Sequence, residues 1–340
     1  MKSEAILPYF HSSPSPTLVD QSGRLLRYLR LSVTDACNFR CTYCLPNGYK
    51  PTREESSLSP IEIENLVRGF ADLGFKKVRI TGGEPTLRRD LLEIVRRVAG
   101  TADLQKIALS TNGSSLARLA APLRAAGLTH LNVSLDTLDR ESFHRLVGAD
   151  RLPEVLSGIE AALNAGFPWI KMNAVLLREF TPSTLDRFLE WVGHRPVTVR
   201  FIELMRTGEN GGFFSQQHYS SGELLLELRR RGWTQIPRAL DDGPAVEFSH
   251  PESQGRVGII APYREGFCEQ CNRLRVTHTG GLRLCLFGEQ DYSLRELLQA
   301  PDQREELAAA IRRWVGNKAP RHLLKEEKYG ITRNFAGIGG

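Results

Sequence analysis

The chain has 340 residues, of which 41% are hydrophobic and 25% are charged, as in ordinary globular proteins. This composition excludes global disorder, and no apolar run approaches the about 18 residues that a transmembrane helix needs. Lys and Arg (45) outnumber Asp and Glu (39), and the resulting charge of +6 suits an anionic small molecule or a nucleic acid without choosing between them. Six cysteines are too few for a disulfide scaffold in so long a chain.

Residues 1–23 are predicted to form a flexible N-terminal arm, because their Ser-Pro run at 12–16 suits neither a helix nor a strand. The apolar stretch at 5–10 contains Pro8 and is too short for the core of a secretory signal. Because the cysteines also stand at ligand-like spacings, we expect a reducing, cytoplasmic location.

Short apolar runs then alternate with amphipathic segments. The first helix is predicted to begin after Ser59, because Pro60 and Glu62 complete a helix-start pattern with that residue. The predicted strands cover residues 29–33, 77–81, 107–110, 131–135, 171–176 and 197–202. The predicted helices cover residues 60–73, 89–99, 115–126, 140–146, 153–165 and 183–192.

Six strand–helix units in about 180 residues favour an α/β fold with a parallel sheet. A complete eight-fold barrel usually needs about 250 residues, so we predict a partial (β/α)6 TIM-type barrel over residues 24–207. Residues 208–340 have a different texture, with a short helix at 222–231 and turn-rich, strand-like pieces. They are predicted to form a C-terminal α+β region that covers the barrel opening.

The loop after the first predicted strand contains Cys37, Cys41 and Cys44 in a C-x3-C-x2-C pattern. Three thiolates in eight residues can reach one metal centre, and an iron–sulfur cubane held by three thiolates keeps its fourth iron free. Zinc binding and buried structural cysteines remain as alternatives. The second predicted strand ends in Gly82-Gly83-Glu84-Pro85, where the glycines allow close backbone approach and Glu84 could accept hydrogen bonds from an ammonium group.

Together these two motifs resemble the radical S-adenosylmethionine superfamily, with Tyr43 as the aromatic residue before the last cysteine. The resemblance implies a 4Fe-4S cluster whose open iron binds the amino and carboxylate groups of S-adenosylmethionine.

Cys268, Cys271 and Cys285 form a second set, C-x2-C-x13-C, which again leaves one metal position open. A zinc ribbon would need a fourth ligand, for which His278 is the local candidate. In an extended Asn272-Arg273-Leu274-Arg275 segment the two arginines lie on one face, which suits a polyphosphate or a carboxylate, although an exposed basic edge strand is the simpler alternative.

With both cysteine sets, the chain resembles the molybdenum cofactor biosynthesis protein A family, whose members are GTP 3′,8-cyclases. The resemblance covers the chain from Arg30 to the C-terminal Gly339-Gly340, a double glycine that in this family reaches into the active site. It implies a lyase with two 4Fe-4S clusters and S-adenosylmethionine as cofactors. The metal ligands would be Cys37, Cys41 and Cys44 for the first cluster and Cys268, Cys271 and Cys285 for the second.

The resemblance also implies the binding residues. S-adenosylmethionine contacts fall on Tyr43, Gly83, Ser134 and Met205. GTP contacts fall on Arg30, Arg79, Ser110 (with Thr111 as the neighbouring alternative), Lys171, Arg273, Leu274 and Arg275, and the catalytic candidates are Arg273 and Arg275. Taken singly, Arg79 could instead pair with Asp136, Met205 could be a core residue, and Lys171 could be a solvated edge.

The implied reaction removes the 3′ hydrogen of the GTP ribose and joins C3′ to C8 of guanine, giving (8S)-3′,8-cyclo-7,8-dihydroguanosine 5′-triphosphate. The family implies a homodimer, an external electron donor, and handover of the product to cyclic pyranopterin monophosphate synthase, with no membrane or nucleic-acid partner. Two other functions stay open: a radical S-adenosylmethionine enzyme that modifies a peptide and carries an auxiliary cluster, and a basic zinc protein that binds nucleic acid.

Overall fold

The computed structural model describes residues 17–51, 56–179, 182–239 and 242–339. Its six N-terminal strand–helix units confirm the predicted partial barrel. The strands are β1 (Tyr28–Ser32), β2 (Lys77–Thr81), β3 (Lys106–Thr111), β4 (His130–Ser134), β5 (Ile170–Leu176) and β6 (Val197–Glu203). The helices are α1 (Pro60–Asp72), α2 (Leu91–Ala99), α3 (Leu116–Ala125), α4 (Arg140–Val147), α5 (Leu152–Asn164) and α6 (Pro182–Gly193).

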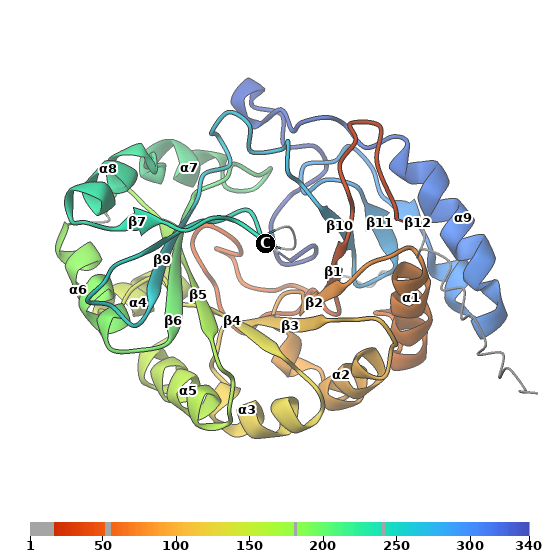
Figure 1. Ribbon diagram of the computed structural model, residues 1–340, viewed down its shortest axis with the longest axis horizontal. Coiled ribbons are helices and arrows are strands. Elements are labelled where there is room, and N and C mark those ends of the chain that lie inside the picture. The colour runs from red at the N-terminus through yellow and green to blue at the C-terminus, as the bar shows by residue number, and fades with distance from the viewer. Residues whose placement is uncertain (1–16, 52–55, 180–181, 240–241, 340) are drawn as a thin grey trace, which may run out of the picture.

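The C-terminal region extends this sheet at both edges, which the sequence does not predict. β9 (Arg256–Ile260) pairs parallel with β6, and β10 (Arg273–Val276) pairs parallel with β1. Antiparallel strands then complete the two edges: β8 (Val246–Ser249) and β7 (Thr234–Gln235) beyond β9, and β11 (Gly281–Arg283) and β12 (Tyr292–Ser293) beyond β10. The strands curve into a ring that stays open between these edges (Figure 1).

The remaining helices of the C-terminal region are α7 (Gly211–Gln217), α8 (Gly222–Arg230) and α9 (Arg304–Val315). α9 packs on α1 at the outer rim, as Figure 1 shows. Gly69 of α1 permits this approach, because a Cβ there would lie 2.4 Å from Leu307 Cδ2. The predicted start of α1 is confirmed: Ser59 Oγ accepts from the Glu62 amide, and Glu62 Oε2 accepts from the Ser59 amide at 2.8 Å.

The two faces of the sheet differ in chemistry. Leu29 and Leu31 of β1 point outward into the core beneath the helices, whereas Tyr28 and Arg30 face the interior of the ring. Strands buried on both faces are usually apolar throughout, so charged residues at alternate positions indicate a hollow interior and not a packed one. Within the described residues, no helix is long and apolar enough to cross a membrane.

Candidate active site

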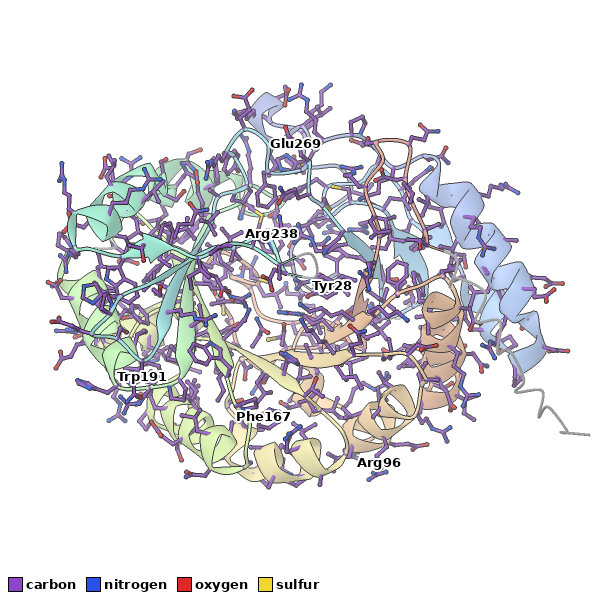
Figure 2. All side chains as sticks on the ribbon, in the orientation of Figure 1. Tyr28, Arg96, Phe167, Trp191, Arg238 and Glu269 are labelled. Carbon is purple, nitrogen blue, oxygen red and sulfur yellow. The ribbon has the colours of Figure 1, made fainter. Side chains whose placement is uncertain are left out.

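A cavity of about 900 Å³ lies inside the ring and is lined by side chains from both the barrel and the C-terminal region. In Figure 2, Tyr28 and Arg238 lie toward the centre of the ring, whereas Arg96 lies at its outer edge. The basic side chains that line the cavity include Arg30, Lys77, Arg79, Lys171, Arg200, Arg273 and Arg275.

Strand register brings the basic residues together. Arg30 on β1 lies opposite Arg79 on β2 and opposite Arg275 on β10, so three guanidinium groups from three strands form one row. A second row lies two residues nearer the amino ends of the same strands and contains Tyr28, Lys77 and Arg273. Residues far apart in sequence thus form one basic surface, because each occupies an inward position of a parallel strand.

Burial of so many cations is electrostatically costly. Burial and the neighbouring arginines hold the pKa of Arg30 well below its usual value. Burial and the charge of Arg79 lower the pKa of Arg200 to about 10. Burial and the charge of Arg273 do the same for Arg275. Among the described residues, the buried Nε atoms of Arg79, Arg200 and Arg275 have no hydrogen-bond partner. Such uncompensated buried donors fit a polyanionic ligand.

Side-chain contacts decide between the alternatives that the sequence leaves open for three positions. Arg79 Nη1 lies 3.3 Å from Ser110 Oγ, and Asp136 is engaged elsewhere, so the Arg79–Asp136 pair does not form. The hydroxyl of Thr111 donates to Glu84 at 2.8 Å, which leaves Ser110 as the residue that faces Arg79. Lys171 lines the cavity and forms an ion pair with Glu247 at 3.1 Å, so it is not a solvated edge residue.

The first cysteine loop follows β1 and is fixed by the Gly-Gly-Glu segment after β2. A Cβ on Gly82 would lie 2.2 Å from the Thr34 carbonyl oxygen, and one on Gly83 would lie 2.2 Å from that of Ala36. The Gly83 amide donates to Thr34 at 2.8 Å, and the Glu84 amide donates to Ala36 at 2.7 Å. The glycines are therefore needed because two backbones meet directly before Cys37.

Glu84 has a different role from the one its sequence suggests. Its side chain is fully buried and accepts hydrogen bonds from the Thr86 amide and hydroxyl, the Thr111 hydroxyl and the Asn112 amide. These contacts commit both carboxylate oxygens to protein donors, so Glu84 joins the end of β2 to the end of β3 and does not present its carboxylate to an ammonium group.

Of the predicted S-adenosylmethionine residues, Met205 lines the cavity, whereas Tyr43, Gly83 and Ser134 are not among its lining residues. Tyr43 donates its hydroxyl to Asp136 at 2.7 Å, and Asp136 also accepts from the Val175 amide at 2.8 Å. Ser134 ends β4 and is exposed. Met205, just after β6, lines the cavity and packs on a small apolar cluster, so it is not part of the main core.

The second cysteine set lines the cavity directly, at Cys268, Cys271 and Cys285. Burial would raise the pKa of Cys271, but the positive charges of Arg273 and Lys318 lower it to about 6. Arg24 fastens this loop to the C-terminal segment: its guanidinium donates to the carbonyl of Cys268 at 3.1 Å and to that of Pro320 at 2.6 Å.

Leu274 differs from its neighbours in the predicted substrate stretch. Arg273 and Arg275 line the cavity, but the Leu274 side chain is fully buried in the main core. The alternation of β10 accounts for this difference, because successive residues of a strand face opposite sides.

Both cysteine sets meet at one apolar cluster formed by Leu286, Phe287, Leu324, Phe335 and Ile338. Cys44 of the first set and Cys285 of the second both pack against it, as does Met205. The C-terminal tail that supplies Phe335 and Ile338 continues into the ring (Figure 1), where a Cβ on Gly339 would lie 2.2 Å from Thr81 Cγ2. Gly340 lies outside the described residues.

The donor sets suit iron–sulfur clusters better than single ions. Within the part of the chain that the structure describes, no three His, Cys, Asp or Glu residues converge on one ion. The His278 Nε2 atom lies 3.8 Å from Asp35, and the predicted fourth-ligand role is not supported by this contact. None of the six cysteines forms a disulfide, and burial together with neighbouring thiols raises the pKa of Cys41 in the first set and of Cys268 in the second. Each set therefore keeps its three thiols available to one cluster.

Two protein-family models match the chain. The Radical SAM superfamily model matches residues 31–192, and the Molybdenum Cofactor Synthesis C model matches residues 197–324. A GTP 3′,8-cyclase of Yersinia pestis is 48% identical over 323 residues, which cover 95% of this chain and 99% of that protein. The chain belongs to the GTP 3′,8-cyclase family. A family member from Aeromonas hydrophila is 49% identical, over 98% of this chain and 99% of its own length.

Solved structures of SuiB from Streptococcus suis share the fold. SuiB of Streptococcus suis bound to S-adenosylmethionine superposes with a TM-score of 0.61 at 15% identity, covering 86% of this chain and 69% of that chain. At this identity the likeness shows the fold alone. Membership of the GTP 3′,8-cyclase family and of the superfamily confirms the predicted cofactors, two 4Fe-4S clusters and S-adenosylmethionine, and the prediction that the chain is an enzyme.

The cavity residues that were missed at the sequence level include Tyr28, Lys77 and Arg200. Each stands two positions from an inward polar residue of its own strand: Tyr28 from Arg30, Lys77 from Arg79, and Arg200 from Thr198. The period of two along β1, β2 and β6 is the signal that could have found them.

Proposed function

We propose that this chain converts GTP into (8S)-3′,8-cyclo-7,8-dihydroguanosine 5′-triphosphate in molybdenum cofactor biosynthesis. The observation that carries the proposal is the group of buried basic side chains beside the second cysteine set in one cavity, among which Arg79, Arg200 and Arg275 have buried Nε atoms without a hydrogen-bond partner. A triphosphate with about four negative charges would neutralise these cations and satisfy their free donors.

The two cysteine sets have separate tasks in this proposal. Cys37, Cys41 and Cys44 would hold the cluster that binds S-adenosylmethionine, with Tyr43, Gly83, Ser134 and Met205 beside that cofactor. When bound, the first cluster and S-adenosylmethionine supply a 5′-deoxyadenosyl radical that removes the ribose 3′ hydrogen. Cys268, Cys271 and Cys285 would hold the cluster whose open iron contacts the guanine.

The basic residues would position the substrate. Arg30, Arg79, Lys171, Arg273 and Arg275 would bind the triphosphate, with Ser110 fixing the Arg79 guanidinium and Leu274 contributing only main-chain atoms. Lys77 and Arg200 join this set because they line the same cavity. Arg273 and Arg275 are the catalytic candidates, and burial with the charge of Arg273 lowers the pKa of Arg275 to about 10 in the free protein.

The cellular setting follows from the same proposal. The enzyme would act as a homodimer in the cytoplasm, take electrons from an external donor, and pass its product to cyclic pyranopterin monophosphate synthase. We propose no membrane or nucleic-acid partner, because the charged side chains of the cavity face inward.

Anaerobic reconstitution with iron and sulfide tests the proposal. We expect about eight irons per chain, which corresponds to two cubanes. With a reductant, S-adenosylmethionine and GTP, the protein should form 5′-deoxyadenosine, methionine and the cyclised triphosphate. ATP and CTP serve as controls. Cleavage that depends on a peptide or on another nucleotide, and not on GTP, would overturn the proposal.

A further inference from the structure

Tyr28 is an acidic side chain placed among the cations of the cavity. It is the first residue of β1, is only 2% exposed, and lies opposite Arg273 on β10 and Lys77 on β2. Lys77 Nζ is 4.5 Å from the centre of the phenol ring, and the Arg79 guanidinium carbon is 5.7 Å from it. Figure 2 shows Tyr28 directed toward the centre of the ring.

Basic groups from every neighbouring element act on this phenol. They are Arg30 on its own strand, Lys77 and Arg79 on β2, Arg273 and Arg275 on β10, and Arg200 on β6. A carboxylate elsewhere in the cavity is already engaged, since Glu247 lies 3.1 Å from Lys171 and 4.0 Å from Arg256. An ionised phenol at this position would compensate part of a large positive charge.

The balance of forces favours ionisation. Burial disfavours the phenolate, but the charges of Arg79, Arg30, Lys77 and Arg273 outweigh burial and lower the pKa of Tyr28 to about 7. The phenol is therefore partly ionised near neutral pH when the cavity holds no anion.

We propose that Tyr28 is a countercharge of the empty cavity and that an incoming triphosphate replaces it, so that each binding event returns one solvent proton to the phenolate oxygen. The inference rests on the proposed function, because it takes the triphosphate of GTP as the incoming anion. No electron moves and no covalent bond other than O–H is formed.

This exchange makes GTP affinity depend on pH. The bound triphosphate cancels the field of the cations, so the pKa of Tyr28 rises on binding and the phenol takes up a proton above about pH 7. Affinity should then fall about tenfold per pH unit above that point. Lys77 and His130, whose pKa values burial and neighbouring cations lower to about 8 and about 4, also titrate. Because the Tyr28 phenolate raises the pKa of Lys77, the Tyr28→Phe comparison is repeated in a Lys77→Met background, which removes this second titrating group.

Calorimetric titration of the cluster-loaded protein with GTP, without S-adenosylmethionine or reductant, tests the inference. Buffers with different ionisation enthalpies report the number of protons taken up. At about pH 8, wild type should take up about one more proton per GTP than Tyr28→Phe, and the two should agree near pH 6. Tyr292→Phe is the matched control, because Tyr292 lies on β12 stacked against Trp314. Equal proton uptake by wild type and Tyr28→Phe at both pH values would overturn the inference.

Two further measurements separate this inference from the proposed function. Inorganic tripolyphosphate should reproduce the proton difference even if GTP is not cyclised. Conversely, cyclisation of GTP without a proton difference would refute the role of Tyr28 alone. Ultraviolet difference spectra of the free protein should show one tyrosine ionising between about pH 6 and 8 in wild type and in Tyr292→Phe, and its absence in wild type would also refute the inference.

Discussion

The two cysteine loops share a ligand pattern of three thiols but lie in opposite electrostatic surroundings. In the first loop, burial and the negative charge of Asp136 raise the pKa of Cys41 well above its usual value. In the second loop, burial is outweighed by Arg273 and Lys318, which lower the pKa of Cys271 to about 6. The surroundings of Cys41 therefore disfavour added negative charge and those of Cys271 favour it, whereas burial raises the pKa of Cys268 in the same second loop.

This difference matches the ligands proposed for each site. S-adenosylmethionine carries a cationic sulfonium, which tolerates the acidic surroundings of Cys41, whereas a triphosphate requires the basic surroundings of Cys271. The two sites meet where Cys44 and Cys285 pack on one apolar cluster. The two sites can thus present a cationic cofactor and an anionic substrate to each other beside this cluster.

The largest expected effect comes from removing one thiol of each set. Cys41→Ala should lose the first cluster and all cleavage of S-adenosylmethionine, but it should keep about four irons and bind GTP. Cys271→Ala should keep the first cluster and bind S-adenosylmethionine, but it should form no cyclised product. Iron analysis and binding titrations check both variants. Loss of all iron from either variant would show that the two sites are not independent.

Substitution of an arginine tests the basic surroundings of the second site. Arg273→Ala removes a charged donor from the cavity and should weaken GTP binding by about 2 kcal/mol, or about 30-fold, with both clusters intact. Arg96→Ala on the outer rim is the control and should leave GTP affinity unchanged. If Arg273→Ala lost the iron of the second site, its role would be structural.

Substitution of a glycine tests the close contact that supports the first loop. A Cβ on Gly83 would meet the Ala36 carbonyl, so Gly83→Ala should destabilise the protein by about 1–3 kcal/mol and reduce iron at the first site. Gly212→Ala is the control, since nothing lies within 4 Å of a Cβ there. Thermal unfolding and iron analysis report both effects. Equal behaviour of the two variants would show that the first loop adjusts freely.

The smallest expected effect concerns the support of the second loop. Arg24→Lys keeps the charge but cannot retain all the guanidinium bonds to the carbonyls of Cys268, Ala319 and Pro320. We expect a loss of about 1 kcal/mol in unfolding free energy, with a faster loss of iron from the second site under chelator. An unchanged rate of iron loss under chelator would mean that the hydrogen bonds of Arg24 do not support that cluster.

The sequence predicted the parts of the fold that depend on local patterns. The period of the apolar residues located all six barrel strands, and Ser59 with Glu62 located the start of α1. The pairing of β9 with β6 and of β10 with β1 was not predictable, because it joins segments that lie far apart in the sequence.

In the site, too, the features that depend on local patterns were predictable and those that depend on long-range contacts were not. Arg273 and Arg275 could be assigned to one face because the alternation of side chains along a strand is local. The hydrogen bonds from Thr111 and Asn112 to Glu84 were not predictable, because they join the ends of different strands. Arg200 escaped notice because a single basic residue in an apolar strand carries no motif; its period of two with Thr198 was the available signal, and its register with Asn173 shows that it faces the cavity.

Transfer of deuterium from GTP labelled at the ribose 3′ position tests the central claim that both sites serve one reaction in one cavity. The account predicts that the label appears in 5′-deoxyadenosine and that labelled 5′-deoxyadenosine and cyclised triphosphate form in equal amounts. Unlabelled 5′-deoxyadenosine, or label retained in the product, would contradict it, because the radical would then act on another position or outside the cavity.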